Sequence, residues 1–209
     1  MFIGHLAGAE ILHAVFPQTP VWVSLVGVGF PDLLWGVTVL AGIERAQMGT
    51  GPLQRDITFT HYPYSHSLIL TNLIALIPAL ALVPFYGWQA AIVFLLASIS
   101  HWLLDVIVHI KDLPVLGFGK NDTKVGLGLW RHGPLAFAVE YAVVVAATLL
   151  FVPADKWLWV LVAAAIFHAG NANSFFGFTK ANPFTTPQIY AMLGVVSFAA
   201  MAVVFSFLL

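Results

Sequence analysis

Cysteine is absent from this 209-residue chain, and charged residues are scarce. Without thiolates the chain forms no disulfide and offers a metal only His, carboxylate, water or backbone ligands, which suit zinc, manganese or iron better than copper(I). Only 8% of the residues are charged, against about 25% in an ordinary soluble domain. With 60% hydrophobic residues and a mean hydropathy of +0.93, the composition excludes such a domain and indicates a polytopic membrane protein.

The balance of charged residues narrows the range of partners. A formal net charge of −1 gives no reason to expect a nucleic-acid partner. Histidine, in contrast, is plentiful, with 8 residues, as many as Lys and Arg together. Several of them lie inside or at the ends of apolar segments, where an ionisable side chain indicates a functional site. The first residues lack a basic region and a small-residue cleavage site, so we expect them to belong to the mature protein.

The apolar segments predict an all-α fold, a polytopic membrane helix bundle that forms a single integral-membrane domain over 1–209. We expect about six spans plus a short N-terminal membrane helix over 2–16, which at about 22 Å is short for a crossing. Pro31 lacks an amide donor near the middle of the first span, which predicts a kink or break beside Asp32. The six spans are expected at 21–41, 67–83, 88–109, 134–152, 157–176 and 189–209.

Basic residues are distributed unevenly among the predicted loops. The loops at 42–65, 110–133 and 177–188 hold seven of them, whereas the opposite side holds Lys156 alone. The positive-inside rule therefore predicts that these longer loops are cytoplasmic. The seven residues are Arg45, Arg55, Lys111, Lys120, Lys124, Arg131 and Lys180.

The most specific motif is the stretch SHWLLDVIVH at 100–109. On a helix, His101, Asp105 and His109 fall at i, i+4 and i+8, so they share one face. A His and a carboxylate four residues apart can hold one metal ion without strain. The alternative is a buried, hydrogen-bonded pair that braces neighbouring helices.

Further ionisable residues are expected in the same half of the bilayer as this motif. Asp32 needs pairing, protonation or a metal at mid-membrane depth. His66 follows a structured loop into the second span, although 61–67 could instead be an interfacial loop anchored by its aromatic residues. His168 is better interpreted as an internal hydrogen-bonding group. The candidate metal ligands are His5, Asp32, His66, His101 and Asp105.

The pairs PD at 31–32 and HS at 66–67, with SHWLLD at 100–105, are similar to the signature of a bacterial inner-membrane family of predicted metal-dependent hydrolases. That family resembles, more distantly, zinc-dependent phospholipase C and related single-strand nucleases. Over residues 1–110 the resemblance implies an inner-membrane protein with one or two divalent ions, Zn²⁺ by preference. It assigns Asp32, His66, His101 and Asp105 as ligands, with Asp105 as a possible bridge and His5 as an early ligand.

The chain departs from the soluble relatives in two respects. They carry a His-x-x-x-Glu motif downstream, whereas here His132 and Glu140 are eight residues apart. They also use a free N-terminal amine as a ligand, for which this sequence offers no evident counterpart.

These residues lead to the hypothesis of a membrane-embedded hydrolase that acts on a lipid-like phosphoester, an amphipathic small molecule, from the cytoplasmic leaflet. His61 or His109 would serve as general acid or base, and Lys124, Arg131 and His132 would bind a headgroup phosphate. The sequence gives no signal for an oligomeric state. The alternatives are a transporter or permease for a metal ion or small solute, and a non-catalytic scaffold.

Overall fold

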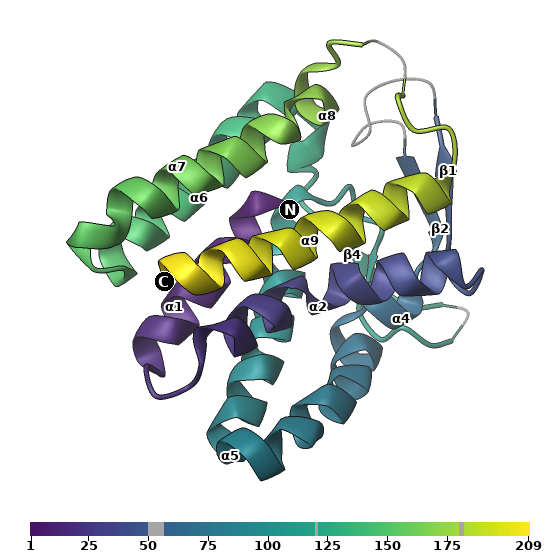
Figure 1. Cartoon of the computed structure of the whole chain (residues 1–209). Coiled ribbons are helices and arrows are strands. Elements are labelled where there is room, and N and C mark those ends of the chain that lie inside the picture. The colour runs from purple at the N-terminus through teal and green to yellow at the C-terminus, as the bar shows by residue number, and fades with distance from the viewer. Residues whose placement is uncertain (50–56, 120, 180–181) are drawn as a thin grey trace.

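The computed structural model describes residues 1–49, 57–119, 121–179 and 182–209 (Figure 1). Most of these residues are helical, which confirms the predicted all-α class. The helices are η1 (Ile3–His5), α1 (Leu6–Val15), α2 (Val21–Leu40), α4 (Pro63–His66), α5 (Leu68–Val108), η2 (Leu129–Arg131), α6 (Gly133–Phe151), η3 (Ala154–Lys156), α7 (Trp157–Gly170), α8 (Ala172–Phe176) and α9 (Pro187–Leu208).

Two short antiparallel ribbons occupy the predicted polar loops. Strand β1 (Arg45–Met48) pairs with β2 (Ile57–His61), and β3 (Leu113–Pro114) pairs with β4 (Lys124–Val125). The first ribbon ends with Arg45 opposite His61 and leads directly into α4. The described parts of the loops at 42–65 and 110–133 are therefore folded and pack beside the helix ends.

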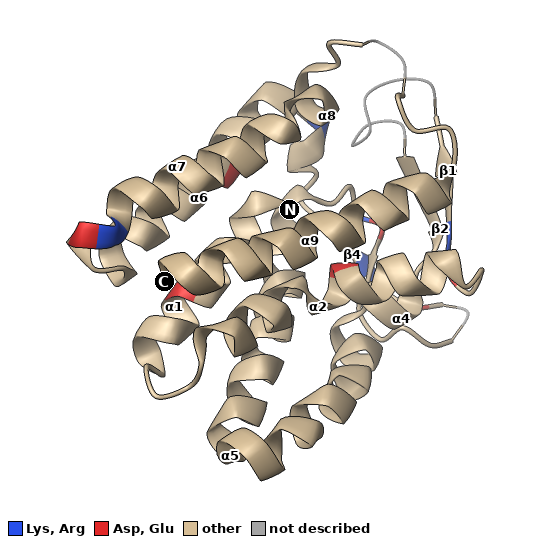
Figure 2. Ribbon diagram, in the orientation of Figure 1, with Lys and Arg blue, Asp and Glu red and all other residues tan. Residues whose placement is uncertain are grey.

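Four of the described helices, α2, α5, α6 and α9, are long and apolar enough to cross a membrane. This finding supports the membrane-protein interpretation, but it does not confirm the predicted count of about six spans. Helix α7 has 14 residues, which fall short of the roughly 20 that a crossing needs. Figure 2 shows that charged residues are missing along α9 and around the bend of α5, and that they gather near the ribbons and at the α6–α7 turn.

The segment labelled α5 contains the two helices predicted at 67–83 and 88–109. Its arms, 68–86 and 88–108, meet at Gly87, whose φ of 75° and ψ of 176° are non-helical. A positive φ of this kind favours glycine because it has no Cβ. In Figure 1 the arms fold back into a V, and the non-helical Gly87 between them forms its apex.

Helix α2 packs between α5 and α9, against which it makes its most extensive contacts. It continues as one helix through Pro31, so no break forms at the position where the sequence predicted a kink or break. Gly27 permits the close approach of α5, because a Cβ atom there would lie 2.6 Å from the Cβ of Ala97. This close packing brings the carbonyl groups of α2 within reach of the polar face of α5.

Two apolar cores meet along the second arm of α5. Ala97 belongs to a core shared with Ile3, Leu6 and Phe198, whereas Trp102 belongs to a core under the ribbons. His101 lies between them in sequence and is almost completely buried. The polar face of α5 is therefore enclosed by apolar side chains from both directions.

Candidate metal centre

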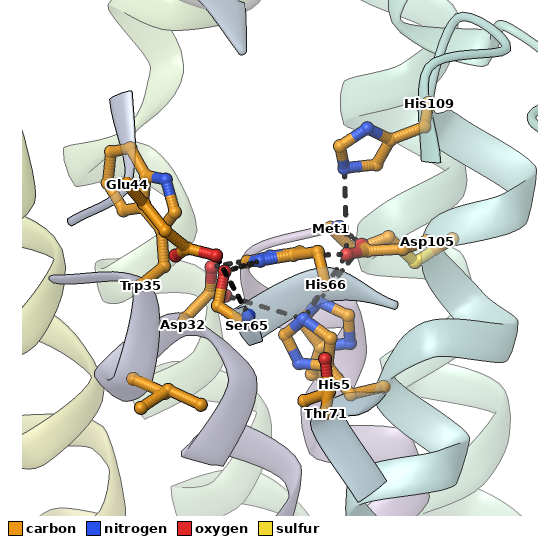
Figure 3. A network of polar contacts seen from close by, with 12 residues as sticks. Met1, His5, Asp32, Trp35, Glu44, Ser65, His66, Thr71, Asp105 and His109 are labelled. Atoms are coloured by element: carbon orange, nitrogen blue, oxygen red, sulfur yellow. Dashed lines mark hydrogen bonds and ion pairs between the residues drawn. The ribbon is translucent and has the colours of Figure 1, made fainter. Parts of the chain in front are cut away.

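The five predicted metal ligands converge at one point (Figure 3). His5 ends η1, Asp32 lies on α2, and His66 ends the four-residue helix α4. His101 and Asp105 lie one turn apart on α5, as the helical spacing predicted. Segments distant in the sequence thus place three imidazoles and two carboxylates together in the interior.

Asp105 is the centre of this cluster. Its Oδ2 atom lies 3.2 Å from Nε2 of His101, 3.6 Å from Nε2 of His109 and 3.8 Å from Nε2 of His66. Its Oδ1 atom lies 3.3 Å from Nε2 of His5. Four imidazoles therefore surround one buried carboxylate.

Asp32 provides the second carboxylate. Its Oδ1 atom lies 3.3 Å from Nε2 of His66, and its Oδ2 atom lies 3.8 Å from Nε2 of His101. The side chain of Asp32 is 21% exposed, whereas that of Asp105 is 2% exposed. Asp32 is thus the carboxylate on the accessible side of the cluster.

Hydrogen bonds behind the imidazoles orient their inner nitrogens. The Nδ1 atom of His101 lies 2.6 Å from the carbonyl oxygen of Val28, and Nδ1 of His109 lies 3.0 Å from Oδ1 of Asp112. Because carbonyl and carboxylate oxygens accept, both Nδ1 atoms donate. Each Nε2 atom is left to face Asp105. This arrangement is typical of metal-ligating histidines, whose second nitrogen bonds to backbone or carboxylate oxygen.

The same geometry leaves buried nitrogens without hydrogen bonds. Among the described residues, Nε2 of His101 and both ring nitrogens of His5 have no hydrogen-bond partner. Nε2 of His5 and Nε2 of His101 lie close to Asp105 but are not oriented for a hydrogen bond to it. The two imidazole rings stack with their centroids 3.6 Å apart. Buried polar atoms in native proteins are normally paired, so these nitrogens are candidate ligands for a metal ion.

Two groups of three residues have ligand atoms within 4.8 Å of one another, namely His5, His101 and Asp105, and Asp32, His66 and His101. Both groups include His101. Since its Nδ1 atom donates to Val28, this imidazole has one lone pair, at Nε2, and can serve only one ion. A second ion would depend on the remaining imidazoles and on bridging by a carboxylate.

Glu44 holds the helix that carries His66, a role that sequence reasoning missed. Its Oε1 atom accepts from the backbone amides of Tyr64 and Ser65, at 2.8 and 3.0 Å, and its Oε2 atom accepts from the Thr38 hydroxyl at 2.6 Å. Glu44 is buried. Its position in a nearly charge-free chain was the only sequence signal, and it fixes α4 to the end of α2.

The amino-terminal segment also contacts the cluster, in a way that the sequence did not reveal. The amino group of Met1 donates to Oδ1 of Asp105. The backbone amide of Phe2 donates to Oε2 of Glu140, 2.8 Å away on α6, and Nε1 of Trp130 lies 3.4 Å from Oε1 of the same side chain. Glu140, noted in the sequence only for its spacing from His132, thus anchors this segment.

His109 and Asp112 form a pair at the end of α5. Burial alone would raise the pKa of Asp112, but the hydrogen bond and positive charge of His109 outweigh it and lower that pKa below its usual value. Asp112 therefore remains a carboxylate at neutral pH and fixes the ring of His109. Of the two predicted acid–base residues, His109 lies in the cluster.

His61 does not join the cluster. It is exposed at the end of β2, and its ring contacts Tyr64 at a centroid distance of 6.1 Å.

The three predicted phosphate-binding residues, Lys124, Arg131 and His132, are also exposed. Arg131 is next to Trp130, which lines the cavity described below. Arg55, Lys120 and Lys180 lie outside the described residues.

Two other buried ionisable groups lie away from the centre. His168 has Nε2 2.8 Å from the carbonyl oxygen of Phe137 and stacks on that ring, in keeping with its interpretation as an internal hydrogen-bonding group. Glu10 accepts from the Thr148 hydroxyl at 3.0 Å, where α1 meets α6. Neither residue approaches the metal-ligand candidates.

A cavity of about 400 Å³ opens beside the cluster. Asp32, His66, Asp105 and His109 form its polar end. This volume lies within the range of small-molecule sites, about 300–1,000 Å³. Three of the five candidate ligands, Asp32, His66 and Asp105, therefore line a space large enough for a small molecule.

The fold and the site together define a class: a helical protein with membrane-length apolar helices and a buried His–Asp cluster beside a cavity. No protein-family model matches the chain, and no curated protein or solved structure gives a significant match.

Proposed function

We propose that this protein is a membrane-embedded, metal-dependent hydrolase, as the resemblance to the inner-membrane hydrolase family implies. The observation that carries the proposal is the set of buried imidazole nitrogens around Asp105 that have no hydrogen-bond partner among the described residues. A neutral His101 directs a lone pair at the carboxylates of Asp32 and Asp105, which is unfavourable without a cation between them.

A divalent metal ion explains the unpaired imidazole nitrogens around Asp105 better than added protons do. A proton satisfies one lone pair, whereas a metal ion coordinates several at once and offsets the charge of two carboxylates. His and Asp ligands in a chain without cysteine fit Zn²⁺, with one or two ions held by His5, Asp32, His66, His101 and Asp105. When bound, such an ion supplies Lewis-acid polarisation of a phosphoryl oxygen and increases the acidity of water.

Side chains that line the cavity position the substrate and supply a proton to its leaving oxygen. The reaction would be phosphoester hydrolysis, in which water forms a new P–O bond and the bond to the leaving oxygen breaks. His109 is better placed than His61 to transfer the proton to that oxygen, because it lines the cavity and is fixed by Asp112. Asp32 faces the same cavity, so substrate and cluster meet there.

We further propose that the chain lies in a bacterial-type inner membrane with its ribbons in the cytoplasm. The two arms of α5 would cross separately, since each is long enough for about 30 Å of hydrocarbon. Lys111, Lys124 and Arg131 would then lie on the cytoplasmic side, where Arg131, Lys124 and His132 are exposed to attract a phosphate headgroup. A lipid-like phosphoester in the cytoplasmic leaflet is the corresponding substrate.

The transporter alternative requires a polar path through the bundle. The only buried carboxylate described on α1, Glu10, pairs with Thr148. Between it and the cluster lies an apolar core that includes Ile3, Leu6 and Val144. This core disfavours transport.

Hydrolysis of bis(p-nitrophenyl) phosphate by zinc-loaded protein tests the proposal. We expect turnover by the wild-type protein, its loss in Asp105→Asn, and near wild-type turnover in His13→Gln, which changes a histidine outside the cluster. Absence of turnover together with metal uptake into vesicles that Asp32→Ala abolishes would support the transporter instead.

A further inference from the structure

The cavity beside the metal centre continues away from it between two helices. Beyond the polar end formed by Asp32 and His66, its walls are Phe167 on α7 and Leu193 and Phe198 on α9. Along α9, Tyr190 lies nearest the ribbons, and Leu193 and Phe198 lie further along the helix, with Ser197 as the polar exception. Along α7, the apolar Ile166 and Phe167 likewise precede the polar Asn171 at the helix end. We call this deeper part the α7–α9 groove.

Helices α7 and α9 share a buried core beyond the groove, through Ala164 and Phe205, but they pack less closely along the groove itself. Helix α9 lies along α2, whereas its contacts with α7 are slight, and Figure 1 shows α6 and α7 as a layer separate from α9. A Cβ atom at Gly170 or at Gly194 would meet nothing within 4 Å. The small residues on facing helices thus leave a space that larger side chains would fill.

The mouth of the groove faces the region that lipid occupies around a membrane helix. Ile166 and Leu193, both on its wall, are 68% and 41% exposed. Helix α9 has membrane-crossing length and hydropathy, so side chains exposed in its middle contact hydrocarbon. In a bilayer, the exposed wall residues would place the groove between hydrocarbon and the His–Asp cluster.

A largely apolar groove with a polar end formed by Asp32 and His66 matches an amphipathic molecule that has an apolar chain and a polar group at one end. We propose that the α7–α9 groove binds the hydrocarbon chain of a single-chain amphipathic phosphoester, which enters laterally from the bilayer and places its phosphate at Asp32 and His66. This inference rests on the proposed hydrolase function, whose substrate class it defines. Binding of the phosphate would then depend on the metal, whereas binding of the hydrocarbon chain would not.

Photo-crosslinking tests the groove directly. The probe is a twelve-carbon alkyl phosphate with a diazirine at the chain end, added to the purified full-length protein in nanodiscs and mapped by mass spectrometry. We expect adducts concentrated in 166–170 and 193–198, reduced by an excess of unlabelled dodecyl phosphate. Adducts spread evenly over exposed helix surfaces, or insensitive to the competitor, would overturn the proposal.

Two matched variants sharpen the test. Gly194→Trp fills the groove from a position with open space and should decrease adduct yield at least tenfold, whereas Met192→Trp, exposed and by helical spacing on the opposite face of α9 from the lining residues, should leave it unchanged. Gly170→Trp provides an independent variant from the opposite wall. Equal labelling of the wild type and both glycine variants would contradict the groove assignment.

Metal analysis of the same samples separates this inference from the hydrolase proposal. Adducts in the groove of a protein that contains no metal would support the chain-binding site and contradict metal-dependent hydrolysis. Metal-dependent phosphodiester turnover with adducts only outside the groove would support the hydrolase and overturn the chain-binding site.

Discussion

His101 and Val28 form the contact that orients the centre of the site. The imidazole Nδ1 atom donates to the carbonyl oxygen of Val28 over 2.6 Å, across the interface of α5 and α2. This bond fixes the tautomer and turns Nε2 toward Asp105, 3.2 Å away. A backbone carbonyl of one helix therefore determines how the other presents its metal ligand.

Removal of the metal should destabilise the protein. Chelation leaves the buried carboxylates and imidazoles uncompensated, and an ion at about 100 times its Kd contributes about 2.7 kcal/mol. For a chain of this length, we expect an apparent Tm lower by about 5–10 °C. Thermal unfolding with and without EDTA measures the effect, and re-addition of Zn²⁺ should restore the Tm. An unchanged Tm would support the scaffold alternative.

Glu44 should control metal affinity without touching the metal. Glu44→Ala removes the acceptor for the amides of Tyr64 and Ser65, so α4 and the His66 ring lose their fixed position. We expect metal affinity to fall about 10–100-fold, as for other partners that orient ligands. Competition titration with a zinc indicator measures it. Glu10→Gln, another buried acid, is the control and should bind metal as the wild type does.

His109 and His61 should differ in their effect on catalysis. His109→Ala removes a cavity-lining imidazole and should decrease kcat about 10²–10⁴-fold while metal content is retained. His61→Ala changes an exposed residue at the end of β2 and should leave kcat close to that of the wild type. Phosphodiester turnover of the two variants decides between them. A large loss of kcat in His61→Ala with little change in His109→Ala would assign proton transfer to His61 instead.

The approach of α2 to α5 should tolerate no side chain at residue 27. Gly27→Val forces atoms against Ala97 and should destabilise the protein by about 1–3 kcal/mol through overpacking. Gly194→Ala adds its Cβ to open space and should stabilise α9 by up to about 1 kcal/mol. Denaturation in matched detergent compares the two variants. If Gly27→Val is as stable as the wild type, α2 and α5 can move apart without loss of stability, which would contradict this prediction.

Long apolar runs allowed most helices to be located from the sequence. The spans predicted at 21–41, 134–152 and 189–209 correspond closely to α2, α6 and α9. The predicted fifth span instead contains α7, which ends at Gly170, and the short helix α8. Neither the apolar character of 157–176 nor its length revealed this interruption.

The candidate site was only partly predictable. Helical spacing placed His101 and Asp105 on one face, and the burial cost of Asp32 marked it as functional. The partners that orient the site were missed, because helices that are apolar on all sides carry no periodic signal of which face meets which neighbour. Glu44 and Glu140 therefore gained their roles only from the packing of α2 against α4 and of α6 against the amino-terminal segment.

Metal content tests the central claim most directly. Elemental analysis of protein purified without chelators should find one or two divalent ions, zinc by preference, per wild-type chain. His101→Ala and Asp105→Ala should lose this metal, and His13→Gln should keep it. Stoichiometric metal in the wild type that is lost only in the two cluster variants is the predicted result. A metal-free wild type, or full metal content in His101→Ala and Asp105→Ala, would contradict the account.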